Sequence, residues 1–147
     1  MKISYGIVVI LFLLSSSFMV LTRMESPELL LAGKWQEVEW EYERTNHTKD
    51  RQEVVISGEQ KKEICSQLII HNDPEWEFDV DQRILTIGDK EQLSWSIKGR
   101  GHLLELNGVK GTENYQIVEL TQDKLVLYVN FDLQIRGIIK MTFKRIG

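Results

Sequence analysis

The sequence predicts an all-β protein: a small antiparallel up-and-down β-barrel with one short helix, preceded by a hydrophobic N-terminal helix. Three observations support this prediction. From Leu31 onward, apolar and polar residues alternate with a period of two, as in strands with one buried face. Turn residues interrupt the alternation every 8–12 residues or so, roughly the spacing found in barrels and sandwiches. The first and last strands carry opposite charges, as neighbours in a closed sheet would.

The first 24 residues differ in composition from the rest of the chain. Residues 3–22 contain no charged side chain, and Lys2 precedes them. A basic start followed by an apolar run predicts export, with the positive end kept in the cytoplasm. Two fates stay open: cleavage of a signal peptide after Ser17, or a membrane anchor formed by residues 3–22. Residues 25–30 are expected to be a linker, and residues 31–147 the barrel domain.

The first strand is predicted from strict alternation over residues 37–43. Large apolar side chains occupy every second position, and glutamates occupy the positions between them. The apolar residues are Val38, Trp40 and Tyr42, and the glutamates are Glu37, Glu39, Glu41 and Glu43. We therefore expect the three apolar side chains on the buried face and all four glutamates in solvent.

Seven further strands follow from the same alternation. They are predicted at residues 74–81, 83–87, 92–98, 102–107, 113–121, 124–131 and 133–145. Glycine, asparagine and aspartate lie between them and supply the backbone conformations of tight turns. Within residues 113–121 the apolar phase changes after Ile117, which predicts a β-bulge.

Residues 57–69 depart from the period of two and predict one short helix. Ser57 and Gln60 have the spacing of a capping box. The apolar face holds Ile64, Cys65, Leu68 and Ile69, and the face toward water holds Lys61, Lys62 and Glu63. We expect this helix to pack against the barrel or to close one end of it. Because Cys65 is the single cysteine, it has no partner for an intramolecular disulfide, and we predict a buried, inert thiol.

The charges of the last strand predict how the barrel closes. In its outward phase this strand carries Arg136, Lys140 and Lys144. If the sheet closes, the first and last strands become neighbours, and the glutamates of the first strand lie opposite these cations. Each exposed pair contributes only about 0.2–1 kcal/mol, so the pairs fix register more than they stabilise.

Several short motifs resemble those of the lipocalin family. Gly33-Lys34-Trp35 matches the Gly-x-Trp signature at the start of the first lipocalin strand, and Arg145 lies at the end of the last strand. The resemblance implies that Arg145 packs over Trp35 and that these residues, with Gly33, form the closed end of the barrel. A guanidinium over an indole face contributes about 0.5–2 kcal/mol. The chain is also similar to small bacterial lipocalin-like domains at residues 76–81, 115–127 and 142–145.

The resemblance implies a binding protein for a small hydrophobic or amphipathic ligand in the periplasm or cell envelope. A barrel of eight strands has room for one small ligand. The inward aromatic residues expected to line its site are Trp40, Tyr42, Trp76, Phe78, Trp95 and Tyr115. The alternative is that the same side chains fill the interior. The barrel would then be an interaction or inhibitor module whose partner is another protein.

Catalysis has no support in the sequence. It contains no nucleophile elbow, phosphate loop or zinc-binding helix, and its three histidines lie in different segments. We therefore predict no catalytic residue, no metal site and no cofactor. The net charge of −4 disfavours nucleic acid as a partner. Contact with a membrane is expected only through the N-terminal segment.

Overall fold

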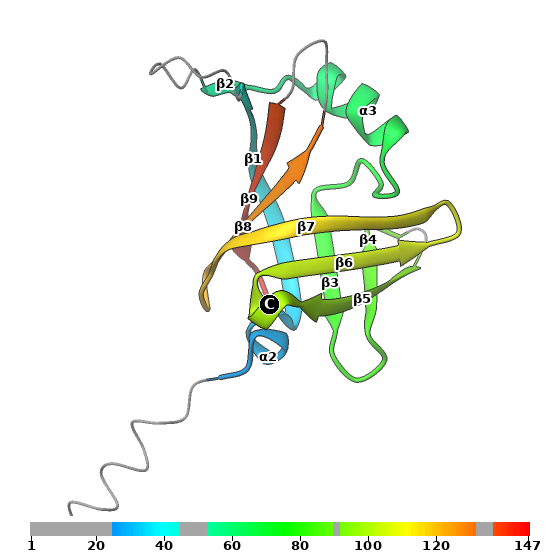
Figure 1. The fold of residues 1–147 in the computed structure, drawn as a ribbon, viewed down its shortest axis with the longest axis vertical. Coiled ribbons are helices and arrows are strands. Elements are labelled where there is room, and N and C mark those ends of the chain that lie inside the picture. The colour runs from blue at the N-terminus through cyan, green and yellow to red at the C-terminus, as the bar shows by residue number, and fades with distance from the viewer. Residues whose placement is uncertain (1–24, 45–52, 90–91, 132–136) are drawn as a thin grey trace, which may run out of the picture.

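The computed structural model describes residues 25–44, 53–89, 92–131 and 137–147 (Figure 1). Strands dominate these residues, which confirms the all-β prediction. In chain order the elements are α2 (Pro27–Leu31), β1 (Gly33–Arg44), β2 (Glu53–Val55), α3 (Gly58–Gln67), β3 (Glu75–Asp79), β4 (Ile84–Ile87), β5 (Gln92–Lys98), β6 (Leu103–Gly108), β7 (Gly111–Leu120), β8 (Lys124–Asn130) and β9 (Gly137–Arg145). The hydrophobic helix predicted within residues 1–24 lies outside the described residues.

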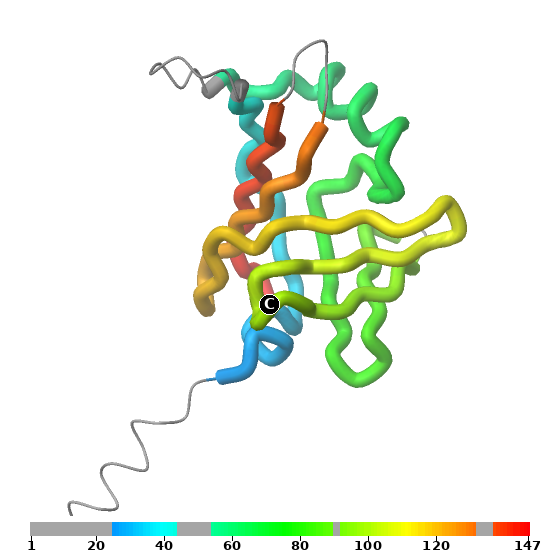
Figure 2. The backbone as a smooth tube through the Cα atoms, in the orientation of Figure 1, coloured from blue at the N-terminus to red at the C-terminus, as the bar shows by residue number. Residues whose placement is uncertain are grey.

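The sheet closes on itself. Its strands are ordered β2-β1-β3-β4-β5-β6-β7-β8-β9, all neighbours are antiparallel, and β1 also pairs with β9. Figure 2 shows the two ends of the domain side by side, with β9 in red along β1 in cyan. The up-and-down order therefore forms an eight-stranded barrel, with β2 as an extra short strand outside the closed ring.

The inward-facing residues of every barrel strand form one hydrophobic core. β3 shows the pattern most simply, because its residues alternate between exposed and buried and place Trp76 and Phe78 inside. The same alternation buries Leu104 and Leu106 on β6. In β7 the pairing register with β8 shifts after Ile117, which confirms the predicted bulge.

β1 differs from its prediction at one point. The register between β1 and β9 shifts between Glu37 and Glu39, and the phase of the strand changes there. The Glu37 side chain is only 5% exposed, whereas Val38 is 59% exposed. The prediction that Glu37 faces solvent and Val38 faces the core is therefore wrong. Trp35 and Trp40 are an odd number of residues apart and are both buried, which a regular strand does not allow.

The charges across the β1–β9 seam match only in part. Glu41 lies directly opposite Lys140, as the closure argument predicted. Lys144 instead lies opposite Gln36. Arg136 is outside the described residues. The seam is therefore held by the backbone ladder, with charge complementarity at one described position.

α3 confirms the predicted short helix. The Ser57 Oγ atom accepts a hydrogen bond from the Gln60 backbone N–H at 3.3 Å, and the Gln60 Oε1 atom accepts one from the Ser57 N–H at 3.1 Å. This reciprocal pair is the predicted capping box. Ile64 and Cys65 are buried and belong to the barrel core. Lys61 was expected in water, but it forms an ion pair with the inward-turned Glu37.

α2 lies at the other end of the barrel from α3 (Figure 1). Residues 25–30 were expected to be a linker, yet Ser26 caps a helical turn there and Leu31 is fully buried. Within the described ranges, no helix is long and apolar enough to cross a membrane. Those ranges also contain no group of three His, Cys, Asp or Glu residues arranged to hold a metal ion.

Candidate functional site

The end of the barrel near α2 is sealed by Trp35 and Arg145. The Arg145 guanidinium carbon lies 4.3 Å from the centroid of the Trp35 ring. Arg145 also donates to the backbone oxygens of Ala32, at 2.7 Å, and of Leu30 and Gln122. One side chain thereby joins α2, β1 and the β7–β8 turn at this end.

Trp35 and Gly33 complete this closed end. The Trp35 indole N–H donates to the backbone oxygen of Leu31 at 2.8 Å, which fixes the ring beneath Arg145. Gly33 has a φ of +121°, and a Cβ atom there would lie 2.6 Å from both the Arg145 Nη1 atom and the Gly147 oxygen. Only glycine satisfies the conformation and the close approach together. No ligand can enter here without breaking these contacts.

The six aromatic residues predicted to line a site are all buried and all face the interior. The structure brings three of them into ring contact. The Phe78 centroid lies 6.3 Å from that of Trp76 and 5.6 Å from that of Trp95. Phe143 of β9, which was not among the predicted lining residues, packs on Trp76 at 4.8 Å.

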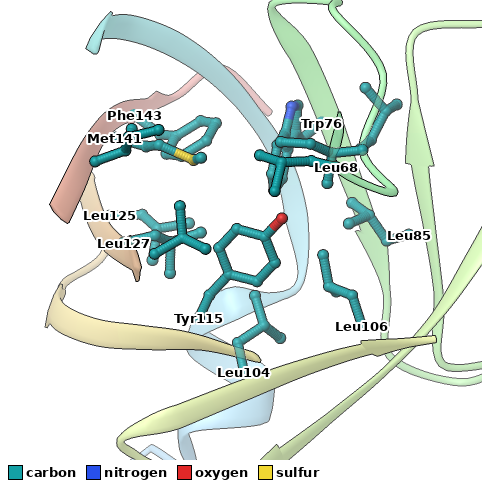
Figure 3. Close-up of a cluster of buried hydrophobic side chains, with 14 of the residues drawn as sticks. Leu68, Trp76, Leu85, Leu104, Leu106, Tyr115, Leu125, Leu127, Met141 and Phe143 are labelled. Atoms are coloured by element: carbon teal, nitrogen blue, oxygen red, sulfur yellow. The ribbon is translucent and has the colours of Figure 1, made fainter. Parts of the chain in front are cut away.

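Figure 3 places these rings within the core. Trp76, Phe143 and Tyr115 come from different strands and point into the same buried cluster, which Leu68 joins from the segment after α3. Trp40 and Tyr42 lie on β1 and are buried in the same core. Besides its contact with Phe78, Trp95 is anchored by its indole N–H, which donates to the Asp79 backbone oxygen at 3.1 Å.

Two buried indole N–H groups have no acceptor. The Nε1 atoms of Trp40 and Trp76 are fully buried, and neither has a hydrogen-bond partner among the described residues. Buried tryptophans normally pair this donor, because leaving it unpaired costs about 1–3 kcal/mol. The apolar interior therefore holds an unused hydrogen-bond donor at Trp76, whereas the Trp40 donor lies near Glu37.

A polar group missed by the sequence reasoning ties α3 to the barrel. The Glu113 Oε1 atom accepts from the Tyr115 hydroxyl at 2.8 Å and from the Ile69 backbone N–H at 3.0 Å. Burial raises the pKa of Tyr115 well above its usual value, and the Glu113 charge raises it further, so the hydroxyl stays protonated and donates. Glu113 lies on the same side of β7 as the buried Tyr115. This alternation is the feature of the sequence that could have identified Glu113 as an inward-facing residue.

Glu37 and Lys61 form a second such group. Burial raises the pKa of the Glu37 carboxyl, while the hydrogen bond and the positive charge of Lys61 lower it in part. The Trp40 indole is also near enough to lower this pKa, although it does not reach hydrogen-bond geometry with the carboxylate. Trp35 and Trp40 are an odd number of residues apart, so both can face inward only if the strand changes phase between them. This spacing is the feature of the sequence that could have revealed the buried position of Glu37.

Together, a closed antiparallel barrel, a sealed end and an aromatic interior define a small up-and-down β-barrel protein. A family model described as a lipocalin-like domain matches residues 31–127, and the chain belongs to this family. No curated protein and no solved structure matches the chain. The family therefore defines a binding fold without indicating a particular ligand.

Proposed function

We propose that this chain is an exported binding protein that holds a small amphipathic molecule inside its barrel. The observation that carries the proposal is the buried, unpaired N–H group of Trp76. A ligand with an acceptor oxygen would satisfy this donor while its apolar part replaces contacts in the aromatic core. A purely hydrocarbon ligand would leave the donor unpaired and would bind less tightly.

The two ends of the barrel differ in a way that supports entry beneath α3. The α2 end is fastened by the three hydrogen bonds of Arg145 and by its stacking on Trp35. The α3 end is covered by one ten-residue helix, tied to the barrel by the Lys61–Glu37 pair and by Glu113. Moving α3 breaks fewer polar contacts than opening the α2 end.

The alternative function is a filled barrel that binds another protein. It is favoured by exposed apolar residues on β1 and β2, since Val38, Val54 and Val55 are 59%, 49% and 61% exposed. Unpaired apolar side chains at the surface are a feature of interaction sites. This alternative leaves the unpaired indole donor of Trp76 in the interior without a role.

Native mass spectrometry and tryptophan fluorescence test the proposal. Fatty acids, fatty alcohols and alkanes of equal chain length should be compared as ligands. We expect the oxygen-bearing ligands to quench fluorescence saturably and to bind more tightly than the alkanes. Trp76→Phe should reduce this preference, because it removes the donor and keeps an aromatic ring. Absence of binding to every member of the panel would favour the filled barrel.

Export is the second part of the proposal, and it rests on the apolar, uncharged residues 3–22. Either a cleaved signal peptide or an uncleaved anchor places residues 31–147 outside the cytoplasmic membrane. Intact spheroplasts should be treated with a membrane-impermeant amine reagent that labels the surface lysines of the domain. Labelling before lysis is expected, and labelling only after lysis would contradict export.

A further inference from the structure

A hollow of about 330 Å³ opens in the barrel wall beside Lys61 of α3, and its lining includes both inward-turned and outward-facing residues of β1. β3 pairs with β1 only up to Gln36, and β2 pairs with it only from Glu41 onward. Along that edge the Glu37 N–H still donates to the Pro74 oxygen at 2.8 Å, and the Trp40 oxygen accepts from the Ile56 N–H at 2.9 Å, so the strand pairing is interrupted at Val38 and Glu39. Lys61 of α3 and Pro74, which precedes β3, border the gap. The hollow is therefore a window in the wall that the β1 bulge helps to form.

The window contains a buried polar group whose hydrogen bonding is incomplete. Glu37 lines it with a side chain that is only 5% exposed, and its Oε1 atom is buried without a hydrogen-bond partner. Trp40 lines it as well and is 4% exposed. A buried carboxylate oxygen without a donor is costly, and each such atom in a folded protein calls for an explanation. A ligand that donates a hydrogen bond would supply what is missing.

Lys61 shows which donor fits the window. Its ammonium forms an ion pair with the Glu37 Oε2 atom and lies 5.1 Å from the centroid of the Trp40 ring. A carboxylate beside an indole face is a general recognition site for ammonium groups. One alkylammonium group, supplied by the chain itself, therefore already pairs with the Oε2 atom, while the buried Oε1 atom has no partner in hydrogen-bond geometry among the described residues.

The rest of the lining fits a short alkylammonium compound. Val38, Val55 and Ile56 provide an apolar wall for a hydrocarbon chain. Glu39 adds a second carboxylate to the rim, and Asp73 is close enough for its charge to act on Glu37. Among the described residues around the window, these carboxylates outnumber the Lys61 ammonium, which favours a cationic ligand over an anionic one.

We infer that this window binds a small alkylammonium compound, whose ammonium donates to the Glu37 Oε1 atom and lies against Trp40. Its alkyl chain contacts Val55 and Ile56. The site shares the Trp40 ring with the core of the barrel, but the contact with Glu37 does not depend on the function proposed for the interior. Lys61 competes with the ligand for the same carboxylate and so limits its affinity.

The test is an NMR titration of the full chain with n-butylamine, and with n-butanol and butyrate as controls of matching chain length. The indole N–H signals of the four tryptophans are followed, and the Trp40 signal is assigned as the one lost in Trp40→Phe. Butylamine is expected to shift the Trp40 signal saturably, and neither control should do so. Equal shifts with butanol, or shifts confined to Trp76, would overturn the inference.

Two substitutions test the roles of the charged groups. Glu37→Gln should weaken butylamine binding by about tenfold or more, because a charged acceptor is lost. Lys61→Met removes the competing ammonium but also the charge that lowers the Glu37 pKa, so it is measured at a pH at which the Glu37 carboxyl is ionised, and there it should strengthen binding. The matched controls are Glu77→Gln on β3 and Lys62→Met on α3, both at exposed positions, and neither should change the affinity.

The two variants also keep the test decisive if one fails to fold. If Glu37→Gln does not fold, the Lys61→Met variant decides the test. Unchanged or weaker butylamine binding in that variant, at a pH at which Glu37 is ionised, contradicts the proposed competition between Lys61 and the ligand. Loss of fatty-acid binding in the interior would leave the butylamine result unaffected. The failure of the proposed function and the failure of this inference are therefore distinguishable.

Discussion

At the scale of single residues, Arg145 has the largest described structural role. It is positioned by the last strand, yet its contacts lie on α2, on β1 and in the β7–β8 turn. The sequence resemblance anticipated its position over Trp35. It did not anticipate the three backbone oxygens, because hydrogen bonds to backbone carbonyls depend on tertiary position and leave no residue pattern.

Replacing Arg145 with alanine should lower the free energy of unfolding by about 2–4 kcal/mol, since the stacking contact is lost and three backbone carbonyls, two of them part-buried, lose their donor. Arg145→Lys should recover only part of this loss, because one ammonium cannot reproduce the planar fork. Urea unfolding followed by tryptophan fluorescence measures both. The control is Lys144→Ala at the exposed neighbouring position, for which a change within about 0.5 kcal/mol is expected. Equal stability of Arg145→Ala and the parent chain would contradict the structural role.

Cys65 supplies a prediction about reactivity. Burial raises the pKa of its thiol from 9.0 to about 11. At neutral pH the thiolate fraction should therefore be about a hundredfold lower than in the unfolded chain. Alkylation by iodoacetamide, followed by mass spectrometry, should be slower by at least this factor and should accelerate as the pH rises toward 11. The same reaction in urea is the control. A native rate that already levels off near pH 9 would contradict the shift.

At the scale of elements, the capping box is the contact that begins α3. Ser57→Ala removes the acceptor for the Gln60 N–H and should cost about 1 kcal/mol. Ser66→Ala makes the same chemical change within the helix and should be neutral or slightly stabilising, because alanine is the better helix former. Urea unfolding compares the two variants. Equal destabilisation by both would show that the cap does not determine the stability of α3.

The elements also show what the sequence could and could not reveal. Alternation located the barrel strands β3 to β8, because one buried face imposes a period of two on each of them. It missed β2, since three residues are too few to display a period and the pairing partner is distant in sequence. It also missed α2, because five residues are too few to display a helical period.

The β1 bulge was not predicted, for a different reason. Acidic and apolar residues alternate regularly over residues 37–43, so the local pattern alone places Glu37 in solvent and Val38 in the core. The competing constraint is tertiary: Trp35 at the sealed end and Trp40 near α3 both have to face inward. The phase change that reconciles them created the buried carboxylate of the window. The candidate site in the wall therefore arises where local pattern and tertiary packing disagree.

At the scale of the whole molecule, closure determines which parts unfold together. β1 pairs with β9 over most of its length, with β3 near its start and with β2 near its end. Strands of the closed ring have neighbours on both sides, whereas β2 pairs only with β1. Opening the ring at the β1–β9 seam would expose core residues from both strands at once, so the seam should share the stability of the whole domain.

Hydrogen–deuterium exchange tests this cooperativity. Peptides from β1 and β9 should exchange as slowly as those from β6 to β8, because each requires global unfolding to open. Peptides from β2 should exchange much faster, since a three-residue edge strand can detach alone. Gly137→Ala offers a perturbation at the seam: its new Cβ atom would overlap the Tyr42 ring across the strand pair. We expect this variant to accelerate exchange in all barrel strands together. Acceleration confined to β9 would mean that the seam opens independently and that the barrel behaves as an open sheet.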